Sequence, residues 1–342
     1  MQSFQIGKNE AGQRFDKYLK KLLSEASGSF IYKMLRKKNI TLNGKKANGS
    51  EKLNVQDEVT LFFSEETFAK FASPMKRISL ETSVSNYPYK PLDIVYEDAD
   101  ILIINKPAGM LSQKAKPDDI SANEYIIGYL LRSHSITAKE LATFRPSICN
   151  RLDYNTSGLL IAGKSLKGLQ EMAEQLNSRD IEKHYRCLVK GWIQKPQMID
   201  GWLLKEEKDN RVQISTTKLP GGKYIRTSYT PLACYQKKSS SRGDGRLKKI
   251  GKKDMDGDMD NFTLLDVHLI TGRSHQIRAH LASVGHPIVG DGKYGDKKTN
   301  DFFARRFHIC GQMLQAYLLR LNDGREFEAP ATAEFERVLG RI

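Results

Sequence analysis

The sequence has few cysteines, fewer acidic than basic residues, and no long apolar run. Its 342 residues include four cysteines, Cys149, Cys187, Cys234 and Cys310, which form no CxxC pair. This argues against both a disulfide framework and a cysteine zinc site. No segment approaches the roughly 18 apolar residues of a membrane helix, and the first residues lack the apolar core of a signal peptide. These absences predict a soluble protein of the reducing cytoplasm without a membrane partner.

Nucleotide and metal motifs are also missing. Neither GxGxxG nor GxxxxGK[ST] occurs, so the sequence does not support a nucleotide cofactor. His275 and His280 are five residues apart and lack the flanking carboxylate of a metalloprotease helix, which argues against a metal site.

The charge balance favours a polyanionic partner. Lys and Arg total 55 against 40 Asp and Glu, for a formal net charge of +15 and a pI of about 9.5. Such a field attracts nucleic acid and would serve little purpose around a small neutral substrate. At roughly 100–200 residues per domain, the length predicts about two domains.

Residues 1–63 are predicted to form a small basic domain. Apolar residues recur at helical spacing over 15–22 and 30–35, and two Asn-Gly pairs in the segment 40–50 indicate a turn-rich β unit after these helices. Residues 1–62 hold 12 basic and 6 acidic residues. Such a charge run is often only a solvated helix face. The cations expected to contact phosphates are Lys33, Arg36, Lys37, Lys38, Lys45 and Lys46.

The rest of the chain predicts a linker and an α+β domain. Residues 64–91 show little periodicity, which predicts a linker. From residue 92 to 342, strand-like apolar runs are interleaved with helical stripes at 167–176 and 274–285, which favours one large sheet over a doubly wound fold. Residues 237–260 are polar and of low complexity, and they are expected to form a long surface loop.

Two polar segments contain candidate reactive residues. Asp153 stands before the apolar run 159–162, where an Asp followed by Asn, Thr, Ser and Gly commonly closes an Asx turn. Four ionisable residues share a helix-like spacing: Arg273, His275, Arg278 and His280. This helix is either exposed and basic or buried, and a buried Arg278 must meet a carboxylate because an unpaired interior cation is costly.

These segments resemble the motifs of the RluA-type pseudouridine synthases in the family's order. NRLDYNTSGLL (150–160) resembles HRLDxxTSGLL, and residues 94–110 resemble the first motif. Residues 182–191 are similar to KxYxxxVxG, and residues 269–295 are close to the third motif. Residues 12–60 resemble the RNA-binding unit named after ribosomal protein S-four, as in the RluC- and RluD-like branch. Several long motifs in order are far more specific than any one of them.

The resemblance implies a reaction and a fold. The catalytic domain would be built on a mixed, mainly antiparallel sheet preceded by a small α/β RNA-binding domain. The activity would be the isomerisation of specific uridines to pseudouridine in structured RNA, in particular large-subunit ribosomal RNA. The family resemblance favours a monomer, and the reaction involves no redox change and requires no cofactor.

The resemblance also assigns roles to individual residues. Asp153 would be the nucleophile or base, and Arg278 the cation beside it. Tyr185 would lie against the uracil and serve as the route for the final proton removal. Arg151 would replace the flipped uridine in the RNA stack. The remaining residues assigned to RNA are Lys106, Lys183, Arg273 and His275. The two lysines would support either the site or the phosphates.

The match has two departures and leaves two rival functions. Asn150 and Gln315 stand where the family usually has His, so hydrogen bonding around the site is expected to differ. One rival is a non-catalytic RNA-binding ribosome-assembly factor on the same scaffold. The other is a hydrolytic nucleosidase or glycosidase, which normally needs a second placed carboxylate.

Overall fold

Within residues 1–72, two helices pack on a four-stranded antiparallel sheet. The computed structural model describes residues 1–72, 87–138, 140–206, 211–237, 247–250 and 261–340. Helices α1 (Phe15–Leu22) and α2 (Gly28–Arg36) form where the apolar spacing predicts them, and their buried faces share one core. The strands are β1 (Gln2–Gln5), β2 (Ile40–Leu42), β3 (Lys45–Lys46) and β4 (Glu58–Leu61), in the order β1-β4-β2-β3.

Strand β1 precedes the helices, which corrects the predicted order of helices followed by strands. Gln2 pairs with Leu61 and Gln5 with Glu58. This pairing brings together segments more than fifty residues apart, and a four-residue strand gives too short an alternation to be recognised locally.

The predicted linker begins with a helix. Residues Glu65–Phe71 form α3, and the Phe71 ring lies against Phe30 of α2 with the centroids 4.4 Å apart. The expectation of little regular structure is therefore wrong for residues 65–71, because aromatic packing on the N-terminal core stabilises a helix that is too short to show a clear period. Residues 73–86 lie outside the described residues, and the domain boundaries remain a prediction.

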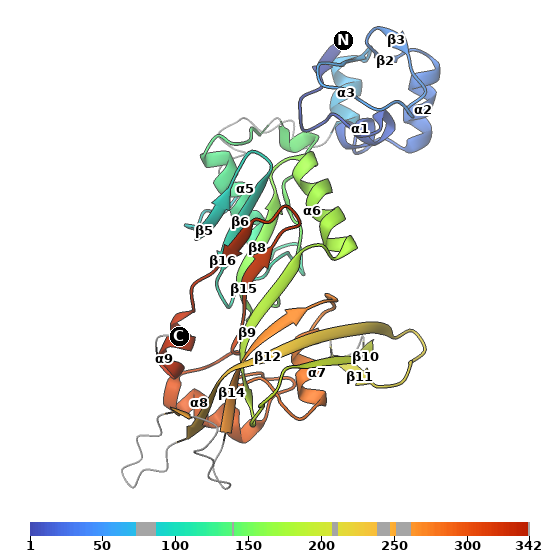
Figure 1. The fold of residues 1–342 in the computed structure, drawn as a ribbon. Coiled ribbons are helices and arrows are strands. Elements are labelled where there is room, and N and C mark those ends of the chain that lie inside the picture. Colours follow the sequence, from blue (N-terminus) through green and yellow to red (C-terminus); the bar gives the residue numbers. More distant parts are fainter. Residues whose placement is uncertain (73–86, 139, 207–210, 238–246, 251–260, 341–342) are drawn as a thin grey trace.

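One large sheet organises the rest of the chain (Figure 1). Its strands are β5 (Ile94–Glu97), β6 (Ile101–Lys106), β7 (Ser147–Ile148), β8 (Ser157–Gly163), β9 (Glu182–Lys190), β10 (Gln197–Glu206), β11 (Arg211–Ser215), β12 (Lys223–Lys237), β13 (Leu247–Ile250), β14 (Asn261–Leu269), β15 (Leu314–Arg320) and β16 (Glu326–Glu328). The order is β11-β10-β12-β14-β9-β15-β8-β6-β5, with β13, β16 and β7 beside β12, β15 and β8. Strands β15 and β8 are parallel, and the other recorded pairs in the described segments are antiparallel. The predicted large, mainly antiparallel sheet is confirmed.

Alternating side chains give this sheet two buried faces. Leu102 and Ile104 of β6 join the core of helix α5 (Ala122–Arg132), which also contains residues of helix α7 (Gln276–Ser283). Ile101 and Ile103 point to the other face, under helix α6 (Leu166–Ser178). Helices α8 (Lys297–Phe307) and α9 (Ala333–Leu339) cover that second face further along the sheet (Figure 1). A 3-10 turn, η2, spans Glu140–Ala142. Among the helices of the described segments, none has the length and hydropathy that a bilayer span requires.

The predicted surface loop at 237–260 contains a strand. Leu247–Ile250 forms β13 and pairs with β12, with Ile250 opposite Cys234. The loop prediction is wrong for these four residues, because pairing with an existing strand edge stabilises an extended segment that is too short to show a strand pattern by itself. Residues 238–246 and 251–260 lie outside the described residues.

Candidate active site

The predicted nucleophile Asp153 lies in the loop between β7 and β8. A backbone hydrogen bond from the Thr156 N–H to the Asp153 carbonyl closes the turn (3.0 Å). The Asp153 carboxylate instead accepts a hydrogen bond from Arg278, and 27% of its side-chain surface stays exposed. The Asx-turn alternative is therefore wrong for this Asp. Its carboxylate is held in place and still open to a substrate.

Arg278 of α7 bridges two carboxylates. Its Nη1 donates to Asp153 Oδ2 (2.8 Å), while its Nε and Nη2 donate to the two oxygens of Asp291 (2.7 and 2.9 Å). Arg278 is 7% exposed and Asp291 1%. The expectation that a buried Arg278 meets a carboxylate is confirmed, but the sequence reasoning missed Asp291. The available signal was that Asp291 is the only acidic residue in the segment 269–295.

This ion pair keeps both of its partners charged. Burial by itself would raise the pKa of Asp291, but the hydrogen bonds and charge of Arg278 outweigh it and hold that pKa below its usual value. Burial by itself would lower the pKa of Arg278, and the two carboxylates raise it instead. Arg278 therefore presents a fixed positive charge to Asp153.

Helix α7 is buried, so the exposed-helix alternative is wrong. His275 is the N-cap residue of α7 and adopts a left-handed conformation (φ 56°). The Nε2 of His275 lies 3.9 Å from Asp153 Oδ2, and its Nδ1 lies 3.1 Å from the Tyr294 hydroxyl. Burial lowers the pKa of His275, which favours the neutral ring. The His280 Nδ1 lies 3.0 Å from the hydroxyl of Thr227 on β12.

The turn after β6 clamps the backbone on both sides of Asp153. On one side, the Ser112 hydroxyl donates to the Leu152 carbonyl (2.8 Å) and accepts from the Leu152 N–H (3.0 Å). On the other side, the Gly109 N–H donates to the Tyr154 carbonyl (2.9 Å). Gly109 has a φ of 77°, a conformation in which glycine is not strained. The sequence reasoning missed Ser112, whose role depends on a contact across 40 residues.

Lys106 completes this clamp from inside the protein. Its side chain has no exposed surface, and its Nζ donates to the carbonyls of Pro107 (2.8 Å), Met110 (2.8 Å) and Tyr154 (3.3 Å). Of the two roles that the sequence left open, burial rules out direct contact with RNA phosphates and leaves support of the site. Direct contact between Lys106 and RNA is therefore not expected.

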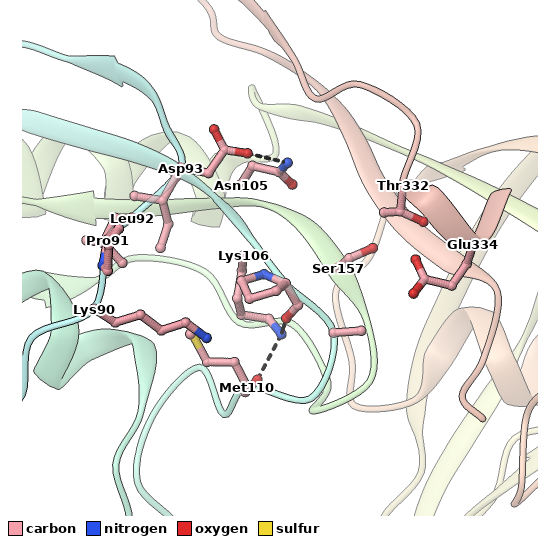
Figure 2. A pocket seen from close by; sticks show the side chains of 13 residues that line it. Lys90, Pro91, Leu92, Asp93, Asn105, Lys106, Met110, Ser157, Thr332 and Glu334 are labelled. Carbon is pink, nitrogen blue, oxygen red and sulfur yellow. Dashed lines mark hydrogen bonds between the residues drawn. The ribbon is translucent and has the colours of Figure 1, made fainter. Parts of the chain in front are cut away.

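A cavity of about 380 Å³ lies beside this turn. Figure 2 shows it between the β5–β6 segment, Ser157 and the C-terminal residues Thr332 and Glu334, with Lys106 in contact with Met110. The three residues predicted to carry the chemistry, Asp153, Tyr185 and Arg278, do not line it. The cavity therefore adjoins the turn that clamps the Asp153 loop but is not lined by these three side chains.

We predict that activity falls as Lys106 loses its proton. Burial lowers the pKa of Lys106 to about 8. Below this pH the ammonium has three donors for three carbonyls, whereas the neutral amine has two. The single-turnover rate of the wild type should therefore decline between pH 7 and 9, and Lys106→Met should be slow throughout without this decline.

Loss of protein stability at Lys106 would not explain a fall in rate with rising pH. The folded pKa of Lys106 lies below the ordinary 10.5, so the unfolded chain binds more protons between pH 8 and 10.5. Over that range the Lys106 contribution to the free energy of unfolding rises with pH. A decline of equal size in Lys106→Met would show that another group is responsible.

Tyr185 of β9 lies in the core that also contains residues of α5 and α7. It is 6% exposed and pairs across the sheet with Ala316 of β15 and Val267 of β14. Burial raises its pKa, and the negative charge of Asp153 adds to the rise. The neutral phenol is therefore strongly favoured near pH 7.

The residues assigned to RNA divide into exposed and buried groups. Lys183 is 8% exposed and its Nζ lies 3.4 Å from the Ile181 carbonyl, and its role stays a prediction. His275 is half-buried beside Asp153. The residues with exposed side chains are Lys33, Arg36, Lys37, Lys38, Lys45, Lys46, Arg151 and Arg273.

The two departures from the family pattern support the fold. The Asn150 Oδ1 accepts from the Ile161 N–H (2.8 Å) and thereby ties the loop that holds Asp153 to β8. Gln315 pairs with Arg186, whereas its neighbour Ala316 pairs with Tyr185, so Gln315 points to the opposite face of the sheet. There its Nε2 donates to the Pro330 carbonyl (2.7 Å). The expectation of altered hydrogen bonding near the site does not apply to Gln315.

Comparisons with known proteins identify the family. A family model described as RNA pseudouridylate synthase matches residues 100–283. The ribosomal large subunit pseudouridine synthase C of Buchnera aphidicola is 31% identical over 315 residues, covering 91% of this chain and 86% of its own. A Bacillus subtilis protein named uncharacterized RNA pseudouridine synthase YlyB is 28% identical over 340 residues, covering 97% and 95%. The chain belongs to the RNA pseudouridylate synthases, a family of isomerases.

A solved structure agrees on the fold. The human RNA pseudouridylate synthase domain containing 1 matches with a TM-score of 0.51 and 22% identity, covering 70% of this chain and 83% of its own. This likeness concerns the fold alone.

Proposed function

We propose that this protein converts specific uridines of large-subunit ribosomal RNA to pseudouridine, with Asp153 as the reacting carboxylate and without a cofactor. The supporting observation is the half-buried Asp153 carboxylate held 2.8 Å from the buried Arg278. The substrate class is supported by the similar Buchnera aphidicola protein, whose name assigns it to the large ribosomal subunit.

The chemistry requires one carboxylate at the nucleoside. Isomerisation breaks the bond between the sugar and N1 of uracil, turns the base, and joins the sugar to C5, which loses its proton while N1 gains one. No electron is gained or lost, so the reaction needs no redox group. An Asp carboxylate is ionised at neutral pH and can act as nucleophile or base. The fixed charge of Arg278 orients Asp153 towards the exposed side of the site.

Tyr185 and Arg151 are proposed to hold the base and the RNA. The buried ring of Tyr185 offers an apolar wall for uracil, and its raised pKa favours packing over proton removal. Arg151 is exposed two residues before Asp153. A planar guanidinium there can stack in the place of the flipped uridine and still contact phosphates.

The N-terminal unit is proposed to bind RNA. Its cations on and after α2 are exposed, whereas inward-facing apolar residues of its helices, such as Phe15 and Ile31, lie in the core. Residues 1–63 would then act as an S-four-type domain and 92–342 as the catalytic domain of a monomer. Phosphate contacts of this kind position the RNA without reading its sequence.

The hydrolytic alternative needs a general acid, and Asp291 cannot serve as one. A glycosidase needs a carboxylic acid to protonate the leaving group as well as a nucleophile or base. Asp291 is 1% exposed, and both of its oxygens accept hydrogen bonds from Arg278. Since its pKa is also held low, Asp291 is not available as an acid.

Tritium release tests the proposal. The wild type would be incubated with large-subunit ribosomal RNA labelled with tritium at C5 of uracil, and with small-subunit RNA as the matched control. That hydrogen leaves when C5 bonds to the sugar, so we expect release of a few tritium atoms per large-subunit RNA. Release from neither RNA would contradict the activity, and release of free uracil would support the hydrolytic alternative.

A further inference from the structure

Tyr294 packs against the ion pair of the site and against the fold around it. Its backbone N–H donates to Asp291 Oδ1 (3.1 Å), and its ring lies over the Arg278 guanidinium, with the ring centroid 5.4 Å from Cζ. The ring also packs against the small core that contains Ile225 of β12 and Ala279 of α7. These contacts fix the position of the Tyr294 side chain beside the ion pair.

The Tyr294 hydroxyl lies between an edge strand and a ring beside Asp153. Strand β11 ends the sheet order, and the Val212 N–H of this strand donates to the Tyr294 hydroxyl (2.9 Å). The same hydroxyl lies 3.1 Å from His275 Nδ1, and the two rings meet edge to face at 71°, with their centroids 5.8 Å apart. The hydroxyl therefore joins β11 to the residue whose Nε2 is 3.9 Å from Asp153 Oδ2.

The hydrogen-bonding capacity of this hydroxyl favours one tautomer of His275. A tyrosine hydroxyl has a single hydrogen to donate and lone pairs to accept with. Val212 uses a lone pair, which leaves the hydrogen for Nδ1 of His275. Burial lowers the pKa of His275 and favours the neutral ring, and a neutral ring that accepts at Nδ1 carries its hydrogen on Nε2.

The negative charge of Asp153 favours the same tautomer. A hydrogen on His275 Nε2 is attracted to the carboxylate, whereas a lone pair there would be repelled. The 3.9 Å between Nε2 and Oδ2 is too long for a hydrogen bond, so Asp153 does not occupy this donor. A nucleotide bound at the exposed carboxylate would bring its own oxygens within reach of the Nε2–H.

We propose that Tyr294 is a positioning residue, whose hydroxyl fixes His275 with its hydrogen on Nε2 so that this N–H donates to an oxygen of the target nucleotide beside Asp153. This inference rests on the proposed function, since it takes the target uridine to lie at Asp153. A neutral imidazole supplies the hydrogen bond without adding a second positive charge to that of Arg278.

Nuclear magnetic resonance of isotope-labelled histidine reads the tautomer directly, in the protein without RNA. The chain has seven histidines, and His275→Gln identifies the signals of His275. At about pH 8, where histidine is ordinarily neutral, the wild type should carry this hydrogen mainly on Nε2. Tyr294→Phe keeps the ring over Arg278 but lacks the hydroxyl, and it should move a measurable part of the population to Nδ1–H. The control Tyr129→Phe removes a hydroxyl that donates to Glu97 (2.7 Å) and should change nothing.

Reaction rates on RNA separate this role from simple packing. Tyr294→Phe should lower the single-turnover rate about tenfold, which is the usual scale for one hydrogen bond lost at a reacting group. In a His275→Gln background an amide N–H takes the place of the Nε2–H and has no tautomer to fix. There the same change should cost less than about twofold, because the two residues act as one unit.

Two results would overturn the proposal. One is a His275 hydrogen that lies mainly on Nδ1 in the wild type, and the other is an equal loss of rate from Tyr294→Phe in both backgrounds. If the wild type converts no uridine, the proposed function fails, and the resonance comparison still decides whether Tyr294 fixes His275.

Discussion

Asp153→Asn should abolish turnover while RNA binding stays within about threefold of the wild type. Asn has nearly the same size but is neither a nucleophile nor a base at neutral pH, and loss of a reacting group typically costs on the order of 10⁴-fold or more in kcat. Because Asp153 keeps 27% of its side chain exposed and the loop is closed by backbone bonds, the substitution should not disturb folding. Tritium release and filter binding on the same RNA measure the two effects.

Two controls make this result interpretable. Asp323→Asn alters an exposed Asp that pairs with Arg325 (2.7 Å) and should leave turnover unchanged. Measurable turnover by Asp153→Asn, after deamidation of the variant has been excluded by mass spectrometry, would remove Asp153 from the reaction. Loss of RNA binding in parallel with activity would instead assign Asp153 to substrate binding.

Asp291→Asn should lower both stability and kcat. In the wild type both carboxylate oxygens of Asp291 accept from Arg278, whereas the NH₂ group of Asn would face one guanidinium donor with another donor. Breaking one side of a buried pair typically costs about 3–5 kcal/mol. Arg278 would then no longer hold Asp153 in position, and a shift of about 1 Å can cost roughly 100-fold in rate.

Unfolding in urea and steady-state kinetics separate these effects. Asp323→Asn again provides the matched change, and since its pair is exposed it should alter the free energy of unfolding by less than about 1 kcal/mol. We expect the loss in Asp291→Asn to fall on kcat more than on KM, because Asp291 has 1% exposure and does not reach the substrate. A fully active variant would show that Arg278 is held without Asp291.

Short-range patterns predicted much of the fold. The stripes around Phe15 and Ile31 predicted α1 and α2, and the apolar runs predicted the strands of the large sheet. Where the pattern was too short to show a period, as in α3, β1 and β13, prediction failed. Each of these elements is stabilised by contacts with distant residues, such as Phe30 for α3 and Cys234 for β13.

The candidate site was likewise only partly predictable from the sequence. A buried Arg278 needs a carboxylate partner because burying an unpaired charge is costly. In the structure Arg278 pairs with Asp153 and Asp291. Which residues would be buried was not visible in the sequence. Lysine is a common phosphate ligand, but the side chains of Lys106 on β6 and Lys183 on β9 are buried in the structure.

By itself, the sequence determined the basic charge of the protein, its helices and strands of clear period, its family motifs, and the candidates Asp153, Arg278 and Tyr185. Only the tertiary structure decided that Asp291 is the second partner of Arg278, that Ser112 and Lys106 clamp the loop that holds Asp153, and that Gln315 points to the far face. The reason is the range of the interactions. Periodicity reports on neighbours within a few residues, whereas the bond between Arg278 and Asp153 crosses 125 residues and exists only once the register of the large sheet is set.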